Sequence, residues 1–582
     1  MKKLYLIIAV LIPSSGIFSQ TKYIGNQANT ISGLTILGRS IGNNCAQKDV
    51  SCIQQLWADP WLNDIVLVRA HDTTTGNGIY YDFSKDGGFS WTVDYAYPYD
   101  CLNDQAQYPS AGIINPSGVL NPDSAYVTFR TRTVHSDEII NGQHQVASGI
   151  AINTANQPLY EPIPNDYTIT RQGIIWETEL PFDSIYYQNK IIVRRGEWSN
   201  LMHAVLFTTD TIPFPMIAIP NGIVSIVSTN IAFAPDGQTG YIVVSGNNGT
   251  YTDSVYYPIV IKTTDGGVTW GAPVAINLSG LDNFFQLGNT AYTLFEHCDA
   301  LVDANGELHI AATVLKHAAA WSVYLNPSYG TFGIFDIYSS GPDWEGRMIS
   351  FPNTFADQVG IVFILRQYNR PQISMDSSAT KLFFVWAETD TLMFGVYENE
   401  YPDIWMRGYD INTGLCTPSI NVTTGTVAFG NSRFHQVSNY CMTGDSIYTI
   451  PVVISLFDDM AQGPASGVTF NYLNDNNVNW SAFTDACSSV TLTATVSISS
   501  PQKENHDCSI IAVNTYDKKV ELRINKSWQL LRVMSIEGKE MLVKSSINSN
   551  YTISRDLLST GVYIYQLFGS DGEVCTGKFL IE

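Results

Sequence analysis

The sequence predicts an all-β protein: a β-propeller of about seven blades, with six or eight as the alternatives, followed by a small Ig-like β-sandwich. Three observations support this fold class. A strand–turn–strand pattern recurs along most of the chain, no apolar period near 3.6 residues is sustained, and Tyr and Gly, which suit strands and tight turns, number 32 and 44 among 582 residues. Hydrophobic residues make up 45% of the chain and charged residues 14%, which excludes a largely disordered protein.

The repeated unit is a short apolar strand, a polar turn and a strand rich in β-branched and aromatic residues. Its copies start at 51, 108, 224, 297, 372 and 435, so the steps are 57, 116, 73, 75 and 63 residues. Because one step is close to double the others, a seventh and divergent unit is expected between Phe129 and Val224, with Lys190–Arg194 and Val205–Thr208 as its strands. Repeated sheets at this period favour propeller blades over a chain of β-sandwiches, which is the alternative.

The chain divides into four segments. Residues 1–19 have the pattern of a secretory signal: a basic start, an apolar stretch at Leu4–Ile12 that is too short to span a bilayer, and a small residue, Ser19, before a polar one. The propeller is expected at 20–499, a polar linker at 500–507 and a C-terminal module at 508–582. The protein is therefore expected to be secreted or at the outer cell surface, reached through the periplasm, and no other apolar run predicts a membrane span.

Charge and cysteine content limit the partners. The chain carries 31 basic and 53 acidic residues, a net charge of -22, which excludes nucleic acid as an expected partner and disfavours anionic membranes. No cofactor is predicted, and a structural calcium ion is the one ion that the acidity would suit. Nine cysteines include no C-x-x-C pair. Cys45–Cys52 is the first expected disulfide. A bridge from Cys575 to Cys508 would stay within the C-terminal module, whereas one to Cys487 would tie the module to the propeller.

Two octets of the pattern S/T-x-D-x-G-x-S/T-W stand out as hairpin turns. In each turn the Asp carboxylate accepts from main-chain amides, the Gly takes a positive φ and the Trp packs between strands. This pattern resembles the Asp-box of sialidase-like (BNR) propellers, and in that family the box is structural and lies away from the active-site mouth. The residues that carry the resemblance are Ser84, Asp86, Gly88 and Trp91 in one octet, and Thr263, Asp265, Gly267 and Trp270 in the other.

The C-terminal module alternates apolar and charged residues, as at Val520–Ile524, and ends on an apolar strand. Its spacing resembles the type A sorting domain of Bacteroidetes type IX secretion, which implies the type IX machinery as a partner. The segment Ala512–Thr515 stands where such domains usually carry Pro-Asn-Pro, which puts the start of the domain in doubt. The motif residues are Gly538, Lys539, Leu558, Gly561, Tyr563 and Lys578.

Catalytic chemistry has little support in the sequence. The resemblance to sialidases would imply three arginines on a carboxylate, a Tyr–Glu nucleophile pair and an Asp acid. The Arg-Ile-Pro signature of that family is absent, and the candidate arginines are Arg69, Arg130, Arg347, Arg366, Arg370 and Arg433. The residues placed by pattern near a propeller mouth are Arg69, His71, Asp72, Arg130 and Arg433.

The cluster Glu296–Asp299, with Asp303 nearby, has residue types that could bind a metal ion. Alternation along a strand sends neighbouring side chains to opposite faces, so no metal site is predicted there. The sequence therefore predicts a secreted or surface propeller that binds a glycan or a protein, with a divergent sialidase-like glycoside hydrolase as the alternative.

Overall fold

A computed structural model of the chain confirms the all-β prediction: nearly every regular element is a strand. The chain forms two compact units that divide between Ile498 and Ser499. This division lies next to the predicted linker at 500–507, which is itself outside the described residues, as is the predicted signal at 1–19. The structure describes residues 26–27, 29–31, 33–40, 54–73, 76–100, 106–115, 121–133, 138–145, 151–158, 167–179, 190–199, 204–214, 226–250, 255–288, 291–295, 298–316, 330–359, 365–395, 398–458, 467–496, 510–516, 519–524, 528–535, 540–547, 550–554, 558, 561–568 and 574–581.

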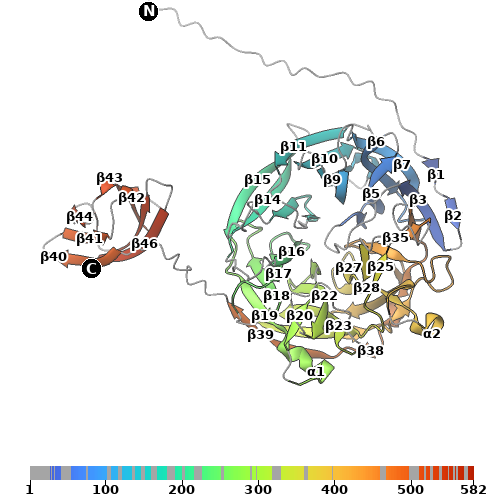
Figure 1. The fold of residues 1–582 in the computed structure, drawn as a ribbon. Helices are drawn as coiled ribbons and strands as arrows, with labels where there is room; N and C mark the ends of the chain where they lie inside the picture. Colours follow the sequence, from blue (N-terminus) through green and yellow to red (C-terminus); the bar gives the residue numbers. More distant parts are fainter. Residues whose placement is uncertain are drawn as a thin grey trace, which may run out of the picture. The chain divides into compact units, whose positions relative to one another are not determined.

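The first unit is a succession of antiparallel sheets, which we number 1 to 7 and which Figure 1 shows arranged in a ring. In sheets 1 to 6 the four strands follow one another in chain order. The strands of the sheets are β4 (Leu56–Asp59), β5 (Asp64–Thr73), β6 (Gly76–Ser84) and β7 (Thr92–Asp100) in sheet 1; β8 (Ala106–Ile114), β9 (Tyr126–Thr133), β10 (Glu138–Gln145) and β11 (Ala151–Pro158) in sheet 2; β12 (Tyr167–Ile169), β13 (Ile175–Glu179), β14 (Lys190–Ser199) and β15 (Ala204–Pro213) in sheet 3; β16 (Ile226–Phe233), β17 (Gly240–Gly246), β18 (Tyr257–Thr263) and β19 (Val274–Asn277) in sheet 4; β21 (Asp299–Val302), β22 (Leu308–Lys316), β23 (Phe332–Ser340) and β24 (Asp343–Ser350) in sheet 5; β27 (Gln372–Met375), β28 (Lys381–Thr389), β29 (Pro402–Asp410) and β30 (Leu415–Cys416) in sheet 6; and β32 (Arg433–Val437), β35 (Val452–Phe457), β36 (Val468–Leu473) and β3 (Leu34–Ser40) in sheet 7.

The first strands of the sheets meet at the centre of the ring. Each contacts the first strand of the next sheet, in the order β4, β8, β12, β16, β21, β27, β32 and back to β4. Sheet 3 is the divergent unit that the spacing predicts, and its strands β14 and β15 contain the expected segments 190–194 and 205–208. A propeller-like ring of this kind has no open end, because the first and last sheets also touch.

Sheet 7 is completed from the other end of the sequence. Its outer strand β3 pairs with β36, with Leu34 opposite Leu473 and Ser40 opposite Val468. This sheet therefore contains strands from both ends of the ring, and its main-chain hydrogen bonds hold the two ends together. A chain whose two ends formed separate sheets would lack these bonds.

The last strand of the unit, β39 (Ser489–Val496), lies between the outer edges of two sheets. It pairs with β19 of sheet 4 and with β24 of sheet 5, so these two sheets continue into one another. Just before it, β38 (Asp485–Ala486) pairs with β30 of sheet 6, and a disulfide joins Cys416 to Cys487. Of the two partners considered for Cys575, Cys487 is therefore excluded, because the strand order brings it to β30. Cys45, Cys52 and Cys508 lie outside the described residues.

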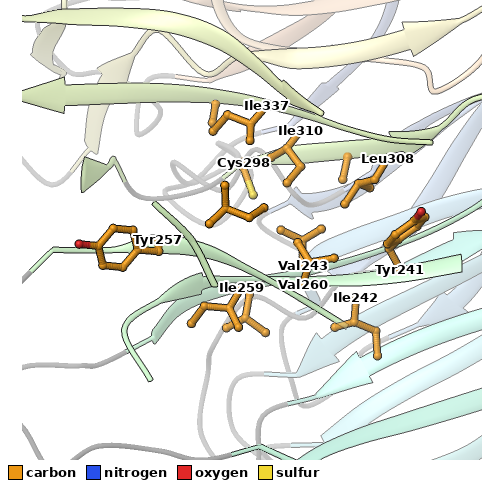
Figure 2. Packing of buried hydrophobic residues seen from close by; sticks show 14 of the residues in the cluster. Tyr241, Ile242, Val243, Tyr257, Ile259, Val260, Cys298, Leu308, Ile310 and Ile337 are labelled. Carbon is orange, nitrogen blue, oxygen red and sulfur yellow. The ribbon is translucent and has the colours of Figure 1, made fainter. Parts of the chain in front are cut away.

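Apolar side chains fill the space between neighbouring sheets. Figure 2 shows this layer between sheets 4 and 5, where Val243 and Val260 of sheet 4 lie towards Leu308 and Ile310 of sheet 5. Every residue of β17 is buried, because each sheet is covered by a neighbour on both faces. Such strands appear in the sequence as continuous apolar runs and not as a strict alternation.

The remaining elements of the first unit are short. They are the strands β1 (Asn26–Gln27), β2 (Asn29–Ile31), β20 (Tyr292–Leu294), β25 (Ala356–Val359), β26 (Leu365–Tyr368), β31 (Ile420–Asn421), β33 (Met442–Thr443), β34 (Ile447–Thr449) and β37 (Asn477–Asn479), the helices α1 (Asp282–Phe285) and α2 (Thr391–Phe394), and the 3-10 turns at Pro122–Ser124, Leu278–Leu281 and Trp480–Ala482. In the described residues, no helix is long and apolar enough to cross a membrane.

The second unit consists of two antiparallel sheets. One contains β40 (Ile510–Tyr516), β41 (Lys519–Ile524) and β44 (Asn550–Ser554); the other contains β42 (Trp528–Ser535), β43 (Glu540–Ile547), β45 (Gly561–Phe568) and β46 (Val574–Ile581). Leu558 and Tyr563 are buried in its core with Trp528 and Leu531. Gly561 begins β45, Lys578 lies in β46, and Gly538 and Lys539 fall outside the described residues.

The two octet turns have the same internal hydrogen bonds. In the turn between β6 and β7, Asp86 Oδ1 accepts from the Ser90 amide at 2.8 Å and the Gly88 amide donates to Ser84 Oγ at 2.8 Å. In the turn between β18 and β19, Asp265 Oδ1 accepts from the Thr269 amide at 2.9 Å. The corresponding Gly267 amide donates to Thr263 Oγ1 at 3.0 Å.

The glycine of each octet is required by its surroundings. Gly88 and Gly267 have φ values of 95° and 79°, and a Cβ atom at either would lie under 3 Å from Tyr472 or Trp176 of the preceding sheet. Hydrogen bonds from the Thr269 hydroxyl and amide, with one from the Thr263 hydroxyl, lower the pKa of Asp265 to about 2.

The tryptophans of the two octets differ in burial. Trp91 is 2% exposed, lies 5.0 Å from the Tyr472 ring and donates from Nε1 to the Gly88 carbonyl at 3.2 Å. Trp270 is only partly buried, with its ring 6.1 Å from Trp176 in an edge contact. The neighbouring sheet thus covers the tryptophan of the first octet more fully than that of the second.

Candidate functional site

The C-terminal ends of several first strands, with the turns that follow them, line one pocket, which we call the axial pocket. Its residues come from β4 and the turn after it, from the end of β8, from β12 and the turn after it, and from the segment that follows β32. These first strands meet only around the centre of the ring, so the pocket lies near the ring axis. Its volume is about 40 Å³, room for a few water molecules, and it is lined by Trp57, Ala58, Asp59, Trp61, Ile113, Asn115, Ile169, Thr170, Arg171, Gly173 and Tyr440.

Three aromatic rings form one wall of the axial pocket. Tyr440 makes edge contacts with Trp61, at 5.2 Å between ring centroids, and with Trp57, at 6.4 Å. Trp57 and Tyr440 are 3% and 5% exposed, whereas Trp61 is half-buried. Edge-to-face packing of this kind fixes the rings, so the wall is rigid before any ligand arrives.

One carboxyl group and one guanidinium group accompany the aromatic wall. Asp59 Oδ1 accepts from the Trp61 and Leu62 amides, each at 3.0 Å, which holds the turn after β4. Arg171 is exposed, and its guanidinium carbon lies 4.5 Å from the Trp61 ring centroid, a cation–π contact that joins sheet 3 to sheet 1. Burial raises the pKa of Asp59, against the two amides and Arg171, which act to lower it.

The carboxyl group of Asp64 lies close behind this turn. Asp64 is opposite Asp59 in the β4–β5 ladder and fully buried. Burial, together with repulsion from Asp59, raises its pKa to about 8. Asp64 is therefore largely neutral at pH 7, which keeps the region behind the pocket free of a second full negative charge.

The axial pocket opens on the face of the ring that carries the octet turns. In an antiparallel sheet of four strands, the first and third turns lie at one edge. The turns that hold Trp61 and Arg171 are first turns, and both octets are third turns.

A second polar cluster lies between sheets 2 and 3. Glu177 Oε2 is 3.9 Å from Arg130 Nε and 3.8 Å from Arg194 Nη1, and Glu179 Oε2 is 2.5 Å from Arg194 Nη2. Tyr167 is opposite Glu177 in the ladder and bonds to the Thr128 hydroxyl. All these side chains are buried, so the cluster is an internal set of ion pairs in the described structure.

The other predicted mouth residues do not gather around one carboxylate position. Arg69 is fully buried and bonds Asp82 Oδ2 at 2.8 Å and also Asp94, within sheet 1. Arg433 donates to the Glu400 carbonyl at 2.6 Å. His71 and Asp72 lie in β5, but their side chains are outside the described residues.

Three further arginines of the candidate set lie elsewhere. Arg347 bonds Asp336 in sheet 5 at 2.5 Å, and Arg370, with a φ of 46°, stands before β27. Arg366 lies in β26. The structure thus brings Arg130 together with a second arginine, Arg194, that the sequence reasoning missed.

The residues considered as metal ligands point in different directions. Cys298 Sγ lies 3.2 Å from Asn230 Oδ1 and 3.3 Å from Ser245 Oγ, whereas Asp299 Oδ2 accepts from the Ile373 amide at 2.9 Å. Asp303 accepts from the amides of its own turn, and Glu296 and His297 are outside the described residues. Across the described ranges, no group of three His, Cys, Asp or Glu side chains converges as metal ligands would.

Sequence reasoning missed most of the axial pocket. Trp57 and Tyr440 appear in the repeat pattern as strand residues, and nothing near Asp59, Trp61 or Arg171 marks them as partners. The one local signal was a pair of tryptophans with an acid between them at the end of an apolar strand. For the second cluster, the alternation Glu177-Thr178-Glu179 in a strand would have placed both glutamates on one face.

Comparison with known proteins gives solved structures only: no family model and no curated protein matches the chain. One similar structure is PorZ, an essential bacterial surface component of the type-IX secretion system of Porphyromonas gingivalis, at 10% identity and a TM-score of 0.31, over 92% of this chain and 60% of that one. The chain thus spans about 60% of the length of PorZ.

Two other similar structures are lyases. A PL25 ulvan lyase matches at 8% identity and a TM-score of 0.39, over 75% of this chain and 94% of that one. An oligogalacturonate lyase in complex with manganese matches at 8% identity and a TM-score of 0.36, over 77% and 97%. At these scores, the likenesses carry no argument about activity.

Proposed function

We propose that this chain is a secreted or cell-surface seven-bladed β-propeller that binds a glycan or a protein and is exported by type IX secretion. The blade number is supported by the cycle of contacts among the first strands, from β4 round to β32 and back. Closure of the last sheet by β3 supports it further, since closed propellers join their ends within one blade.

The observation that carries the binding role is the axial pocket. It combines an aromatic wall with one acidic and one basic side chain, at the place where four sheets meet. Binding sites in proteins are concave, mostly apolar and aromatic, and contain a few placed polar groups. Trp57 and Tyr440 also belong to the buried cluster between the sheets, and Trp61, which packs against that cluster, is the ring of the three that is only partly buried.

Binding is testable on the full exported chain with a glycan panel and with candidate surface proteins. We expect a glycan to bind, and we expect Trp61→Ala to weaken that binding by about tenfold or more, because it removes the half-buried ring of the wall. Trp480→Ala is the matched control, since Trp480 is 48% exposed and does not line the pocket. Equal binding by the chain and by both variants would contradict a role for the pocket.

The sorting role of the C-terminal module makes a separate prediction. Residues 508–582 fused to an inert periplasmic reporter should carry it to the surface or medium of a type IX-competent host. Deleting 500–582 should retain the propeller in the periplasm without changing its melting temperature, because the two units are compact separately. Retention of the fused reporter in the periplasm would leave the module as a plain β-sandwich appendage.

A divergent sialidase-like glycoside hydrolase remains the second candidate function. It is favoured by the cluster of Tyr167, Glu177, Arg130 and Arg194, which contains residue types of such a site. Their burial opposes it, because a substrate must reach the catalytic groups. Release of sialic acid that is lost in Glu177→Gln, with unchanged folding, would replace the binding role with this one.

A further inference from the structure

We propose that an exposed apolar projection of sheet 6, which we call the apolar knob, docks into an apolar pocket on a basic protein partner. The knob consists of Leu392, Met393 and Phe394 of α2, with the rings of Tyr401 and Phe429, on which Phe394 packs. Figure 1 shows α2 at the margin of the ring. Because α2 lies in the second turn of its sheet, between β28 and β29, the knob is at the opposite edge from the axial pocket and the octets. The inference therefore goes beyond the proposed function, since it assigns a second surface that does not use the pocket.

The tip of the knob is open to solvent. Leu392 is 96% exposed, the highest value among the large apolar side chains that the structure describes, and Met393 is 68% exposed. The next residue, Phe394, stacks on the Tyr401 ring at 4.8 Å between centroids and lies 5.5 Å from the Phe429 ring. The five side chains thus form one continuous apolar surface, and surfaces of this kind mark interaction sites.

The short helix that carries the tip is fixed at both ends. Asp390 Oδ1 accepts from the Leu392 amide at 3.0 Å and from the Met393 amide at 3.3 Å. At the other end Gly395, with a φ of 66°, donates from its amide to the Thr391 carbonyl at 3.0 Å. A backbone held in this way loses little conformational freedom when a partner binds, so the tip is preorganised for docking.

The loops beneath the tip are held together by buried polar groups. Asp403 is fully buried, and its Oδ1 accepts from the Gly430 amide at 2.7 Å. The Ser432 amide donates to the Pro402 carbonyl at 2.8 Å, which joins the loop that carries Phe429 to the start of β29. A Cβ atom at Gly430 would lie 2.4 Å from Phe394, so the ring packs there only against glycine. The loops are thus fixed in an arrangement that leaves the tip outside the core.

The charge around the knob favours a basic partner. The segments 390–401 and 420–432 contain three carboxylates, Asp390, Glu398 and Glu400, and no Lys, Arg or His. Glu398 and Glu400 are exposed. An apolar centre with an acidic rim is complementary to an apolar pocket bordered by Lys and Arg, and such complementarity determines which partner is accepted.

The same features disfavour other occupants. A second copy of this chain would bring another acidic rim and a net charge of -22 against the first. An anionic lipid surface is repelled in the same way. A glycan is bound through its hydroxyl groups, and the side chains of Leu392, Met393 and Phe394 offer no hydrogen-bond donor and at most a weak acceptor.

The test measures binding of a fluorescent amphipathic peptide built from Leu and Lys to the full chain, by fluorescence anisotropy. We expect this peptide to bind, and we expect peptides with Ser in place of Leu, or Glu in place of Lys, to bind about tenfold more weakly or less, because each lacks one complementary feature. The double substitution Leu392→Ser and Met393→Ser should weaken binding of the Leu–Lys peptide by about tenfold or more, as central apolar contacts do. Both side chains are exposed, so the melting temperature should not change.

Two further variants separate the apolar effect from the effect of charge. Phe89→Ser is the matched control, because Phe89 is 91% exposed in the first octet turn and lies outside the knob, so peptide binding should not change. Glu398→Gln combined with Glu400→Gln should weaken peptide binding several-fold and make it less dependent on salt, because the acidic rim is lost.

Equal peptide binding by the parent and by the Leu392→Ser, Met393→Ser variant would overturn the inference, since the peptide would then be held elsewhere on the acidic surface. Binding of the Leu–Glu peptide as tightly as the Leu–Lys peptide would overturn the choice of a basic partner. Self-association in analytical ultracentrifugation, or binding to phosphatidylcholine vesicles, that is lost in the double variant would replace the protein partner with a second copy or a membrane. Trp61→Ala should not change peptide binding, so a failure of the proposed pocket function would leave this inference in place.

Discussion

Trp91→Ala is expected to lower the free energy of unfolding of the propeller by about 3–5 kcal/mol, the cost of truncating a large buried aromatic side chain. Trp91 is 2% exposed and packs on Tyr472 of sheet 7, so the substitution leaves a cavity between the first and last sheets. It also removes the donor to the Gly88 carbonyl. The measurement is urea denaturation of the full chain followed by circular dichroism.

Trp270→Ala is the matched control for this effect, because it changes the same position of the second octet. Trp270 is only partly buried, so its loss should be about half as large or less. Equal losses in the two variants would show that the octet turn itself, and not the packing between sheets, determines the stability contributed by these tryptophans.

Asp336→Asn is expected to cost about 3–5 kcal/mol near pH 6, because it leaves two buried cations without their shared carboxylate. Asp336 Oδ2 lies 3.0 Å from His309 Nδ1 and 2.5 Å from Arg347 Nη1, and all three side chains are buried. The Arg347 guanidinium lies between Tyr338 and Tyr409, at 4.1 and 3.5 Å from their ring centroids, so it cannot turn towards solvent without breaking both contacts. The measurement is the same denaturation, repeated between pH 6 and pH 9.5.

The free energy of unfolding should depend on pH in a direction set by the protonation of His309. Burial opposes the charged form of His309, but Asp336 and Asp303 outweigh it and raise its pKa to about 9, above the ordinary 6.5. The stability that this ion pair contributes is therefore complete below pH 6.5 and is lost as the pH rises through 9. In Asp336→Asn that loss should be much smaller, so the variant and the parent should differ less at pH 9.5 than at pH 6.

Asp343→Asn is the control for this series. Asp343 begins the same strand, β24, but is exposed, so its substitution should change stability by no more than about 0.5 kcal/mol at any of these pH values. If Asp336→Asn behaves like Asp343→Asn, the cluster contributes no net stability and its carboxylate is dispensable.

The candidate site shows where prediction from the sequence stops. The strand that ends at Asp59 is evident as an apolar run, and Tyr440 lies in a copy of the repeated unit. Their meeting is not, because it depends on the closure of a ring that brings residues 59, 171 and 440 together. Local patterns describe which residues are buried in a strand; they do not specify which strand will be the neighbour.

The sequence by itself determined the strand class, the repeat with its divergent third unit, the internal bonding of the two octet turns and the polar break near residue 500. Each of these follows from residues close together in the chain, through alternation, turn chemistry and spacing. Only the tertiary structure decided that β3 completes the last sheet, that Cys487 meets Cys416 and that Trp91 is covered more fully than Trp270. These outcomes depend on which sheets become neighbours when the ring closes, and that choice is made by the packing of whole sheets against one another.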